Sequence, residues 1–137
     1  MIKLDRARAQ AVADSLNYNH NGLVIAIAQD VESSEVLMAV FMDPNSVVQT
    51  LISGKAHYFS TRRGLWLKGE RSGHFQEVEE LLVDCDMNAL LLKVRQTGGA
   101  CHLGYKSCFF RRLRGSRFIK FLSKIFKPQE VYGDRRE

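Results

Sequence analysis

The chain of 137 residues lacks several features that would mark whole classes of protein. No apolar run reaches the roughly 18–20 residues that span a bilayer. The N-terminal sequence MIKLDRARAQ has no apolar core of the kind found in secretory signal peptides. Only two prolines are present, and neither an internal repeat nor a low-complexity segment is visible. We therefore expect a cytoplasmic protein that has no membrane partner.

Excess positive charge is confined to the C-terminal end of the chain. A hydrophobic fraction of 45% and a charged fraction of 26% are ordinary for one globular domain. Residues 1–110 contain 11 Lys and Arg against 12 Asp and Glu, whereas residues 111–137 contain 9 against 3. The net charge of +5 therefore comes from the C-terminal residues, and the body of the chain has no excess of positive charge with which to bind nucleic acid. We expect no nucleic-acid partner.

Hydrophobic periodicity predicts a β-rich α+β protein. Residues 4–16 favour a short helix. Asp43 and Pro44 favour the start of a second helix, which Gly54 would end. Apolar runs favour strands, the first two as a hairpin, at residues 22–30, 36–43, 56–60, 64–69, 75–84 and 88–96. We expect a compact mixed or antiparallel sheet, or a barrel-like body, with few short helices.

The C-terminal residues show a different pattern. Apolar side chains recur at helical spacing, with lysines on the other face: Phe118, Phe121, Leu122, Ile125 and Phe126, against Lys120, Lys124 and Lys127. This spacing predicts a basic amphipathic helix. Such a helix can bind an acidic partner, a membrane surface or RNA, but more often it packs on its own domain. We therefore separate a body, residues 1–112, from a helical tail, residues 113–137.

Three cysteines, Cys85, Cys101 and Cys108, fall within 24 residues. An odd number does not suit a disulfide framework, and a cytosolic chain keeps its thiols reduced. The C-x-x-C pairs typical of structural zinc sites are absent. Three thiolates would leave the fourth tetrahedral position for water or substrate, as a catalytic zinc requires. Two alternatives stay open: His102 could fill that position, or the cysteines could be small buried hydrophobes.

Oxygen ligands flank the first cysteine. If residues 84–88 are extended, Asp84, Asp86 and Asn88 face one way and Cys85 faces the other. Two carboxylates and an amide form an oxygen-rich group that suits Mg²⁺. A solvated strand edge is the alternative reading of the same residues.

A polar loop at residues 66–76 has the composition expected of a phosphate-binding segment. It combines glycines, a hydroxyl group and Lys68, and Arg62 and Arg63 precede it. The Walker motif is absent. A solvated loop with no ligand is the alternative.

Two segments together resemble the phosphoribosyl-AMP cyclohydrolase family of histidine biosynthesis: WLKGERSGHFQ at 66–76 and DCDMNALLLKVRQTGGACHLGYKSCF at 84–109. Looser similarity extends the match to roughly residues 22–112. The resemblance implies a hydrolase that opens the purine ring of phosphoribosyl-AMP between N1 and C6. It also implies an intertwined homodimer that uses zinc and magnesium, with the zinc held by three cysteines contributed from both subunits.

The resemblance assigns roles to individual residues. Zinc falls to Cys85, Cys101 and Cys108, and magnesium to Asp84, Asp86 and Asn88. The family usually has an Asp where this chain has Asn88, so we expect weaker magnesium binding here. His102, His74 and His57 are the candidates for proton transfer, because imidazole titrates near neutrality. Substrate binding is expected from Arg63, Trp66, Lys68, Ser72 and Gln76.

Two other functions remain to be compared with this catalytic reading of residues 1–112. A structural zinc module could bind RNA through the basic tail, with Phe109 and Phe110 stacking on bases. A redox-sensing protein would instead form a disulfide among its cysteines and hold no stoichiometric metal.

Overall fold

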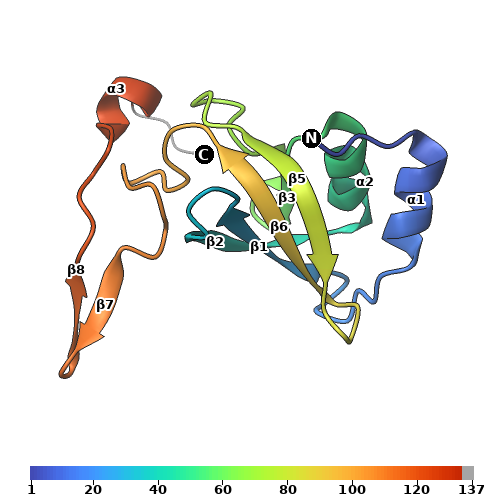
Figure 1. Cartoon of the computed structure of the whole chain (residues 1–137), viewed down its shortest axis with the longest axis horizontal. Helices are drawn as coiled ribbons and strands as arrows, with labels where there is room; N and C mark the ends of the chain where they lie inside the picture. The colour runs from blue at the N-terminus through green and yellow to red at the C-terminus, as the bar shows by residue number, and fades with distance from the viewer. Residues whose placement is uncertain (134–137) are drawn as a thin grey trace.

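The computed structural model describes residues 1–133 and shows a curled six-stranded sheet with two short helices packed against it (Figure 1). In chain order the elements are α1 (Arg6–Asp14), β1 (Val24–Asp30), β2 (Val36–Met42), α2 (Pro44–Ser53), β3 (His57–Ser60), β4 (Gly64–Leu67), β5 (Gln76–Val83), β6 (Ala89–Gln96), β7 (Arg111–Arg114), β8 (Arg117–Lys120) and α3 (Pro128–Tyr132). The strand order is β4-β3-β2-β1-β6-β5. Only the central β1–β6 pair in this sheet is parallel. The predicted β-rich α+β class with a mixed sheet is confirmed.

Local capping explains where the first two helices begin and end. The Asp5 side chain accepts a hydrogen bond from the backbone N–H of Arg8 at the start of α1. Asp43 and Ser46 bond to each other's backbone N–H groups at 2.8 Å, which forms a capping box at α2. Gly54 ends α2 in the left-handed conformation with φ +77°. The predicted limits of α2 are confirmed at both ends.

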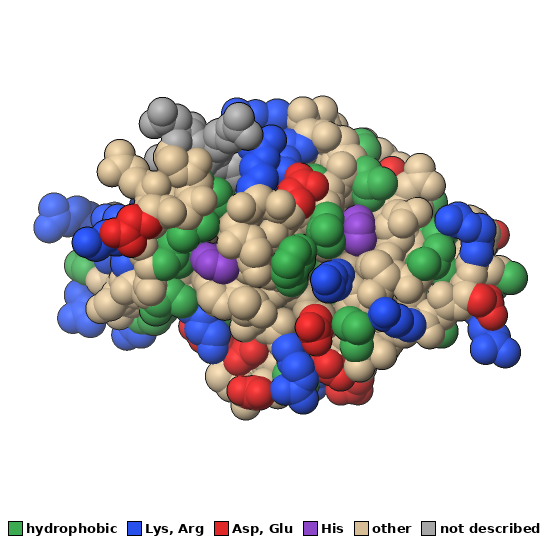
Figure 2. Space-filling view, turned by 90° about the horizontal axis from the view of Figure 1, so that it is seen from above, with side chains coloured by type: hydrophobic (Ala, Val, Ile, Leu, Met, Phe, Trp, Pro, Cys, Tyr) green, Lys and Arg blue, Asp and Glu red, His purple; other side chains and the backbone are tan. Residues whose placement is uncertain are grey.

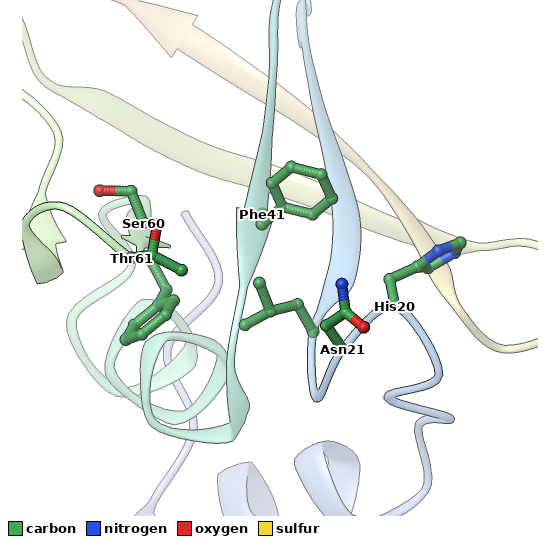
Figure 3. A pocket seen from close by; sticks show the side chains of 7 residues that line it. His20, Asn21, Phe41, Ser60 and Thr61 are labelled. Carbon is green, nitrogen blue, oxygen red and sulfur yellow. The ribbon is translucent and has the colours of Figure 1, made fainter.

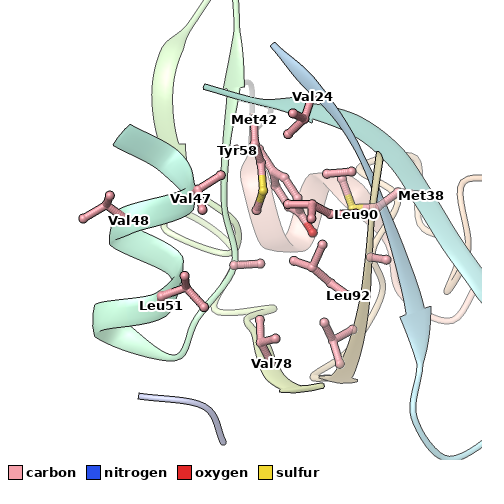
Figure 4. Packing of buried hydrophobic residues seen from close by; sticks show 14 of the residues in the cluster. Val24, Met38, Met42, Val47, Val48, Leu51, Tyr58, Val78, Leu90 and Leu92 are labelled. Atoms are coloured by element: carbon pink, nitrogen blue, oxygen red, sulfur yellow. The ribbon is translucent and has the colours of Figure 1, made fainter. Parts of the chain in front are cut away.

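One face of the sheet carries the hydrophobic core (Figure 4). Because side chains alternate along a strand, every second residue of β1 and β6 points to this face. The buried residues there include Val24, Ala26, Ala28, Met38, Met42, Leu90, Leu92 and Val94. Val47, Val48 and Leu51 of α2 pack onto them, and Tyr58 closes the side of the core. The helices therefore cover this face.

The opposite face of the sheet is apolar as well. The strand register aligns two rows of side chains across it: Leu65, Phe59, Phe41, Ile25 and Ala89 in one row, and Ala39, Ile27, Leu91 and Leu82 in the other. Phe41, Leu65 and Leu82 are more than two-fifths exposed. We call these two rows the open face. Monomeric proteins rarely expose contiguous apolar patches of this kind.

The tail differs from its prediction. Residues 118–127 do not form a helix; instead β7 and β8 form an antiparallel hairpin that extends from the body (Figure 1). Gly115, with φ +64°, and Ser116 make its two-residue turn. A two-residue turn with glycine at its first position has a backbone twist that matches the right-handed twist of the two strands. The preference of Gly115 and Ser116 for this turn outweighs the helical spacing of the apolar residues that follow. The only helix described after residue 112 is α3, and residues 134–137 of the predicted tail lie outside the described residues.

After the hairpin, the chain returns to the body. We call residues 121–127 the strap. Its residues Ile125 and Phe126 donate backbone hydrogen bonds to the carbonyl oxygen of Gly104, at 2.8 and 3.4 Å. The side chain of Tyr132 in α3 is buried and lies 6.2 Å from the ring of Phe126. In the described part of the chain, no helix has the length and apolar character needed to cross a membrane.

Replacing Gly54 by Ala should destabilise the fold more than the same change at Gly22. Both glycines have positive φ, which costs an L-residue about 1–2 kcal/mol. A Cβ at Gly54 would in addition lie 2.7 Å from the carbonyl oxygen of Ile2, whereas a Cβ at Gly22 meets nothing within 4 Å. Equilibrium denaturation of both variants measures the difference, and equal losses would contradict the packing at the N-terminus.

Candidate active site

The structure brings two of the three cysteines into contact at one end of the sheet. Cys101 is buried in the segment between β6 and β7. Cys108 lies later in the same segment, next to β2. The backbone N–H of Cys108 donates to the carbonyl oxygen of Leu37 at 2.7 Å, which fixes the second thiol beside the start of β2. The two thiols lie close enough for each to shift the pKa of the other. Cys101 and Cys108 thus form a thiol pair.

The environment of the thiol pair favours a thiolate at Cys101. The hydrogen bond from Cys108 lowers the pKa of Cys101 to about 6, and the backbone N–H groups of Leu103 and Tyr105 act in the same direction. The positive charge of Lys68 also lowers it. The same thiol–thiol hydrogen bond, together with burial, raises the pKa of Cys108. The environment therefore favours ionisation of Cys101 and opposes that of Cys108.

Cys85 lies at the other end of the sheet. It is exposed in the turn between β5 and β6, whereas the thiol pair follows the far end of β6. Eight residues of β6 separate the two positions, and at about 3.3 Å per residue these strand residues span roughly 23 Å. One chain in this conformation cannot bring all three sulfur atoms to one ion. Within the described residues, no group of three His, Cys, Asp or Glu side chains lies close enough to hold a metal.

The acidic segment next to Cys85 is a turn, so the condition that residues 84–88 are extended is not met. Met87 has φ +58°, and its N–H bonds to the carbonyl oxygen of Asp84 at 3.1 Å. Oδ1 of Asp84 accepts from the N–H groups of Asn88 and Ala89. A carboxylate that caps its own turn favours this conformation over an extended strand. The alternation that placed Asp84, Asp86 and Asn88 on one strand face therefore does not apply, although all three remain in the same short turn.

The polar loop places Lys68 close to the thiol pair rather than in solvent. Lys68 is buried, and its Nζ donates to the carbonyl oxygen of Ala100 at 2.7 Å. Ala100 directly precedes Cys101, so this bond joins the loop to the segment that carries the thiolate. The role expected for Lys68 in binding phosphate stays a prediction.

Arg63 and Trp66 form a second contact in this region. The guanidinium group of Arg63 lies 4.3 Å from the Trp66 ring, and its Nη2 donates to Glu70 at 2.7 Å. Within the described residues, Nη1 of Arg63 and Nε1 of Trp66 are buried without a hydrogen-bond acceptor. Both donors remain candidates for substrate binding.

Gln76, which was predicted to bind substrate, lies in the interior of the protein. The side chain is completely buried. It accepts a hydrogen bond from the Tyr58 hydroxyl at 2.5 Å and donates to Gln96 at 2.8 Å. A substrate cannot contact it in this conformation. Ser72, also predicted to bind substrate, accepts a hydrogen bond from the backbone N–H of His74 at 3.1 Å, so it shapes the same loop.

The three candidate histidines differ in position. His74 lies against the cysteine loop, with Nδ1 at 3.2 Å from the carbonyl oxygen of Gly99. His102 directly follows Cys101 and is half-buried. His57 lies on β3, where its Nδ1 is 2.9 Å from the carbonyl oxygen of Lys55. Burial lowers the pKa of His57, which favours the neutral ring.

The sequence analysis missed the contact of the strap with this site. The Phe126 ring lies edge-on to His74, with 4.8 Å between ring centroids. A Cβ at Gly98 would come within 2.5 Å of the His74 ring, and one at Gly99 within 2.6 Å of the Phe126 ring. A Cβ at Gly104 would come within 2.6 Å of the carbonyl oxygen of Phe126. The three glycines therefore permit close approach by His74 and the strap, and their density in the motif was the available signal.

The sequence of this chain is similar to those of known proteins over most of its length. The model of the phosphoribosyl-AMP cyclohydrolase family matches residues 38–110. The phosphoribosyl-AMP cyclohydrolase of Methanothermobacter thermautotrophicus is 52% identical over 126 residues, which cover 87% of this chain and 91% of the relative. The enzyme of the same name from Methanococcoides burtonii is 51% identical, with 87% and 97% covered. That from Chlorobium chlorochromatii is 48% identical, with 89% and 90% covered.

The chain belongs to the phosphoribosyl-AMP cyclohydrolase family. The resemblance inferred from residues 66–76 and 84–109 is thereby confirmed. The segment matched by the family model contains all three cysteines, the acidic turn, and the polar loop from Trp66 to Gln76. It ends at Phe110, so the hairpin and the strap lie beyond it.

The thiol pair predicts an acidic thiol in the metal-free protein. Ultraviolet thiolate absorbance, followed against pH after chelation, should show one group that titrates with a pKa of about 6, well below the ordinary value of 9.0 for cysteine. Cys101→Ser should remove this transition, whereas Cys85→Ser should leave it in place. A transition that survives Cys101→Ser would contradict the assignment of the thiolate.

Proposed function

We propose that this member of the family opens the purine ring of phosphoribosyl-AMP between N1 and C6 with a water molecule activated by zinc, and that the zinc lies between two copies of the chain. The observation that carries the proposal is the thiol pair, which presents a stabilised thiolate beside the buried cation of Lys68. Cys85, the third cysteine, lies at the opposite end of β6 from the thiol pair. In this conformation, the Cys85 that joins the pair would have to come from another copy of the chain.

The donor set fits zinc. Thiolates are preferred zinc ligands, and a lowered pKa makes Cys101 available at neutral pH without the metal. Three cysteine ligands leave one tetrahedral position open, which distinguishes a catalytic from a structural site. A zinc ion held in this way would supply a bound water with a pKa near 7 instead of about 15.7.

A second copy of the chain would complete the site. If two copies pack through their open faces about a two-fold axis that runs perpendicular to the strands, each end of one sheet lies against the opposite end of the other sheet. The Cys85 turn of each chain then comes to the thiol pair of the other, and two equal sites form. The open face supports this arrangement, because its exposed apolar rows need a covering surface. A hollow of about 540 Å³ between Phe41, Phe59, Thr61 and the His20–Asn21 turn lies beside these rows (Figure 3).

Histidine residues of this chain would move the protons. Opening the ring breaks the bond between N1 and C6, so N1 must gain a proton as it leaves. His74 donates Nδ1–H to the carbonyl oxygen of Gly99, and this leaves Nε2 able to carry the proton. His102, next to Cys101 in the chain, is the second candidate. His57 is held by Lys55 on β3 and is the weakest of the three.

Magnesium would bind at the acidic turn and contact the substrate phosphates. Asp86 is exposed, and the amide oxygen of Asn88 lies two residues further along the turn. Asp84 bonds through Oδ1 to two backbone N–H groups, which leaves Oδ2 for a cation. Mg²⁺ commonly takes one or two carboxylates and retains several waters.

Cytoplasmic localisation stays a prediction.

Complementation between two inactive variants tests the shared zinc site. Cys85→Ser and Cys101→Ser should each abolish zinc binding and ring opening, which is followed by ultraviolet absorbance with and without chelator. When the two variants are unfolded and refolded together, each mixed dimer contains one site with all three cysteines, so about a quarter of wild-type activity should return. A Cys101→Ser/Cys108→Ser double variant offers the control, because mixing it with Cys101→Ser should restore nothing.

Failure of complementation, together with zinc bound to isolated chains, would contradict the sharing of ligands. A wild-type protein that binds zinc and RNA but shows no ring opening would favour the structural RNA-binding alternative.

The acidic turn gives a prediction for magnesium. Asn88→Asp adds a negative charge to the ligand set, so activity should reach half-saturation at a Mg²⁺ concentration several-fold lower than in wild type. Asn45→Asp adds the same charge at the exposed start of α2 and should leave the titration unchanged. Identical titrations of Asn88→Asp and wild type would remove Asn88 from the magnesium site.

A further inference from the structure

A small basic hollow lies between the hairpin and the cysteine loop. Its volume is about 190 Å³, and it is lined by Leu103, Tyr105 and Phe110 together with Arg111, Lys120 and Lys124. Figure 2 shows Lys and Arg side chains gathered at the end of the molecule that carries the hairpin. Lys120 and Lys124 lie beyond the segment that the family model matches, as does Arg111.

The three cations of the hollow have no acidic partner among the residues that the structure describes. Arg111 and Lys120 are directly opposite each other in the β7–β8 register, so their side chains leave the same face of the hairpin. Like charges in this arrangement destabilise a strand pair. Within residues 1–133, none of the three cations forms a salt bridge with a carboxylate. A bound anion would relieve this repulsion.

The hollow shares its wall with the thiol pair. The rings of Tyr105 and Phe110 stack in parallel at 3.8 Å and form one buried cluster with Cys101. The guanidinium group of Arg111 lies 4.3 Å from the Phe110 ring, which holds it at the rim. The stem of Lys124 passes over Gly104, whose N–H bonds to the carbonyl oxygen of Cys101. A ligand in the hollow would therefore lie behind the same tight turn that presents Cys101.

The substrate of the proposed reaction carries two phosphate groups, and these need cations. Two of the residues first expected to bind them already use part of their donor capacity: Lys68 donates to the carbonyl oxygen of Ala100, and Nη2 of Arg63 donates to Glu70. A volume of 190 Å³ is below the roughly 300–1,000 Å³ of pockets that enclose a whole ligand. The hollow is large enough for one end group of a ligand.

We propose that the hollow is a subsite for one phosphate monoester of the substrate, bound by Arg111, Lys120 and Lys124. This inference rests on the proposed function, because it takes the ligand from that reaction. Guanidinium and ammonium donors are the groups that bind phosphate in proteins. Binding of RNA is less favoured, because Tyr105 and Phe110 are buried against each other and offer no free ring face to a base.

Paired charge removals test the subsite in the full-length protein. Lys120→Gln/Lys124→Gln removes two charges from the hollow, whereas Arg117→Gln/Lys127→Gln removes two charges from the same tail outside it. The first variant should raise KM for phosphoribosyl-AMP about tenfold or more and change kcat little, which indicates lost binding in ground and transition states alike. The control variant should keep KM within about twofold of wild type. Circular dichroism and light scattering confirm fold and oligomeric state.

Titration calorimetry with ribose 5-phosphate and with inorganic phosphate measures phosphate binding independently of ring opening. Wild type and the control variant should bind both probes, and Lys120→Gln/Lys124→Gln should bind them at least several-fold more weakly. If no variant turns over substrate but this difference persists, the proposed function fails and the anion subsite stands. If turnover is normal and the hollow variant matches the control in KM and phosphate affinity, the subsite is overturned. Loss of the dimer, or lost RNA affinity with unchanged KM, would also overturn it.

Discussion

The length of β6 is the constraint on which the site depends. This strand runs through the sheet with a cysteine turn before it and the thiol pair after it, and it pairs along its length with β1 on one side and β5 on the other. The cysteines are therefore separated by rigid structure rather than by a flexible loop. In this conformation one chain does not bring all three sulfur atoms to a single ion, which is why the proposed zinc site takes its ligands from two copies of the chain.

The sequence predicted the body of the fold because local and long-range preferences agree there. Alternating or continuous apolar residues mark β1, β2 and β6, and Asp43, Pro44 and Gly54 mark the limits of α2. The tail was predicted wrongly because two signals compete in it. Phe118, Phe121 and Ile125 have helical spacing, but Gly115 and Ser116 make a tight turn that pairs the residues on each side of it. The local turn takes precedence, since few tertiary contacts support a helix at this position.

The family was predictable from the sequence, whereas the geometry of the site was not. The motifs at residues 66–76 and 84–109 resembled the phosphoribosyl-AMP cyclohydrolase family, and the comparisons confirm this family. Nothing in the sequence separates Gln76, which is buried beside Tyr58, from the exposed polar residues of the same loop. Nor does any local pattern link Phe126 to His74, 52 positions earlier in the chain. Such contacts arise only when the sheet has brought distant segments together.

The strap makes the cysteine loop depend on residues that are distant from it in the chain. Phe126 packs against Gly99 and Gly104 and lies edge-on to His74. The six-stranded sheet, by contrast, takes no strand from this segment. Damage confined to the strap would therefore leave all three cysteines and the whole sheet in place while it removed the ring that lies against His74.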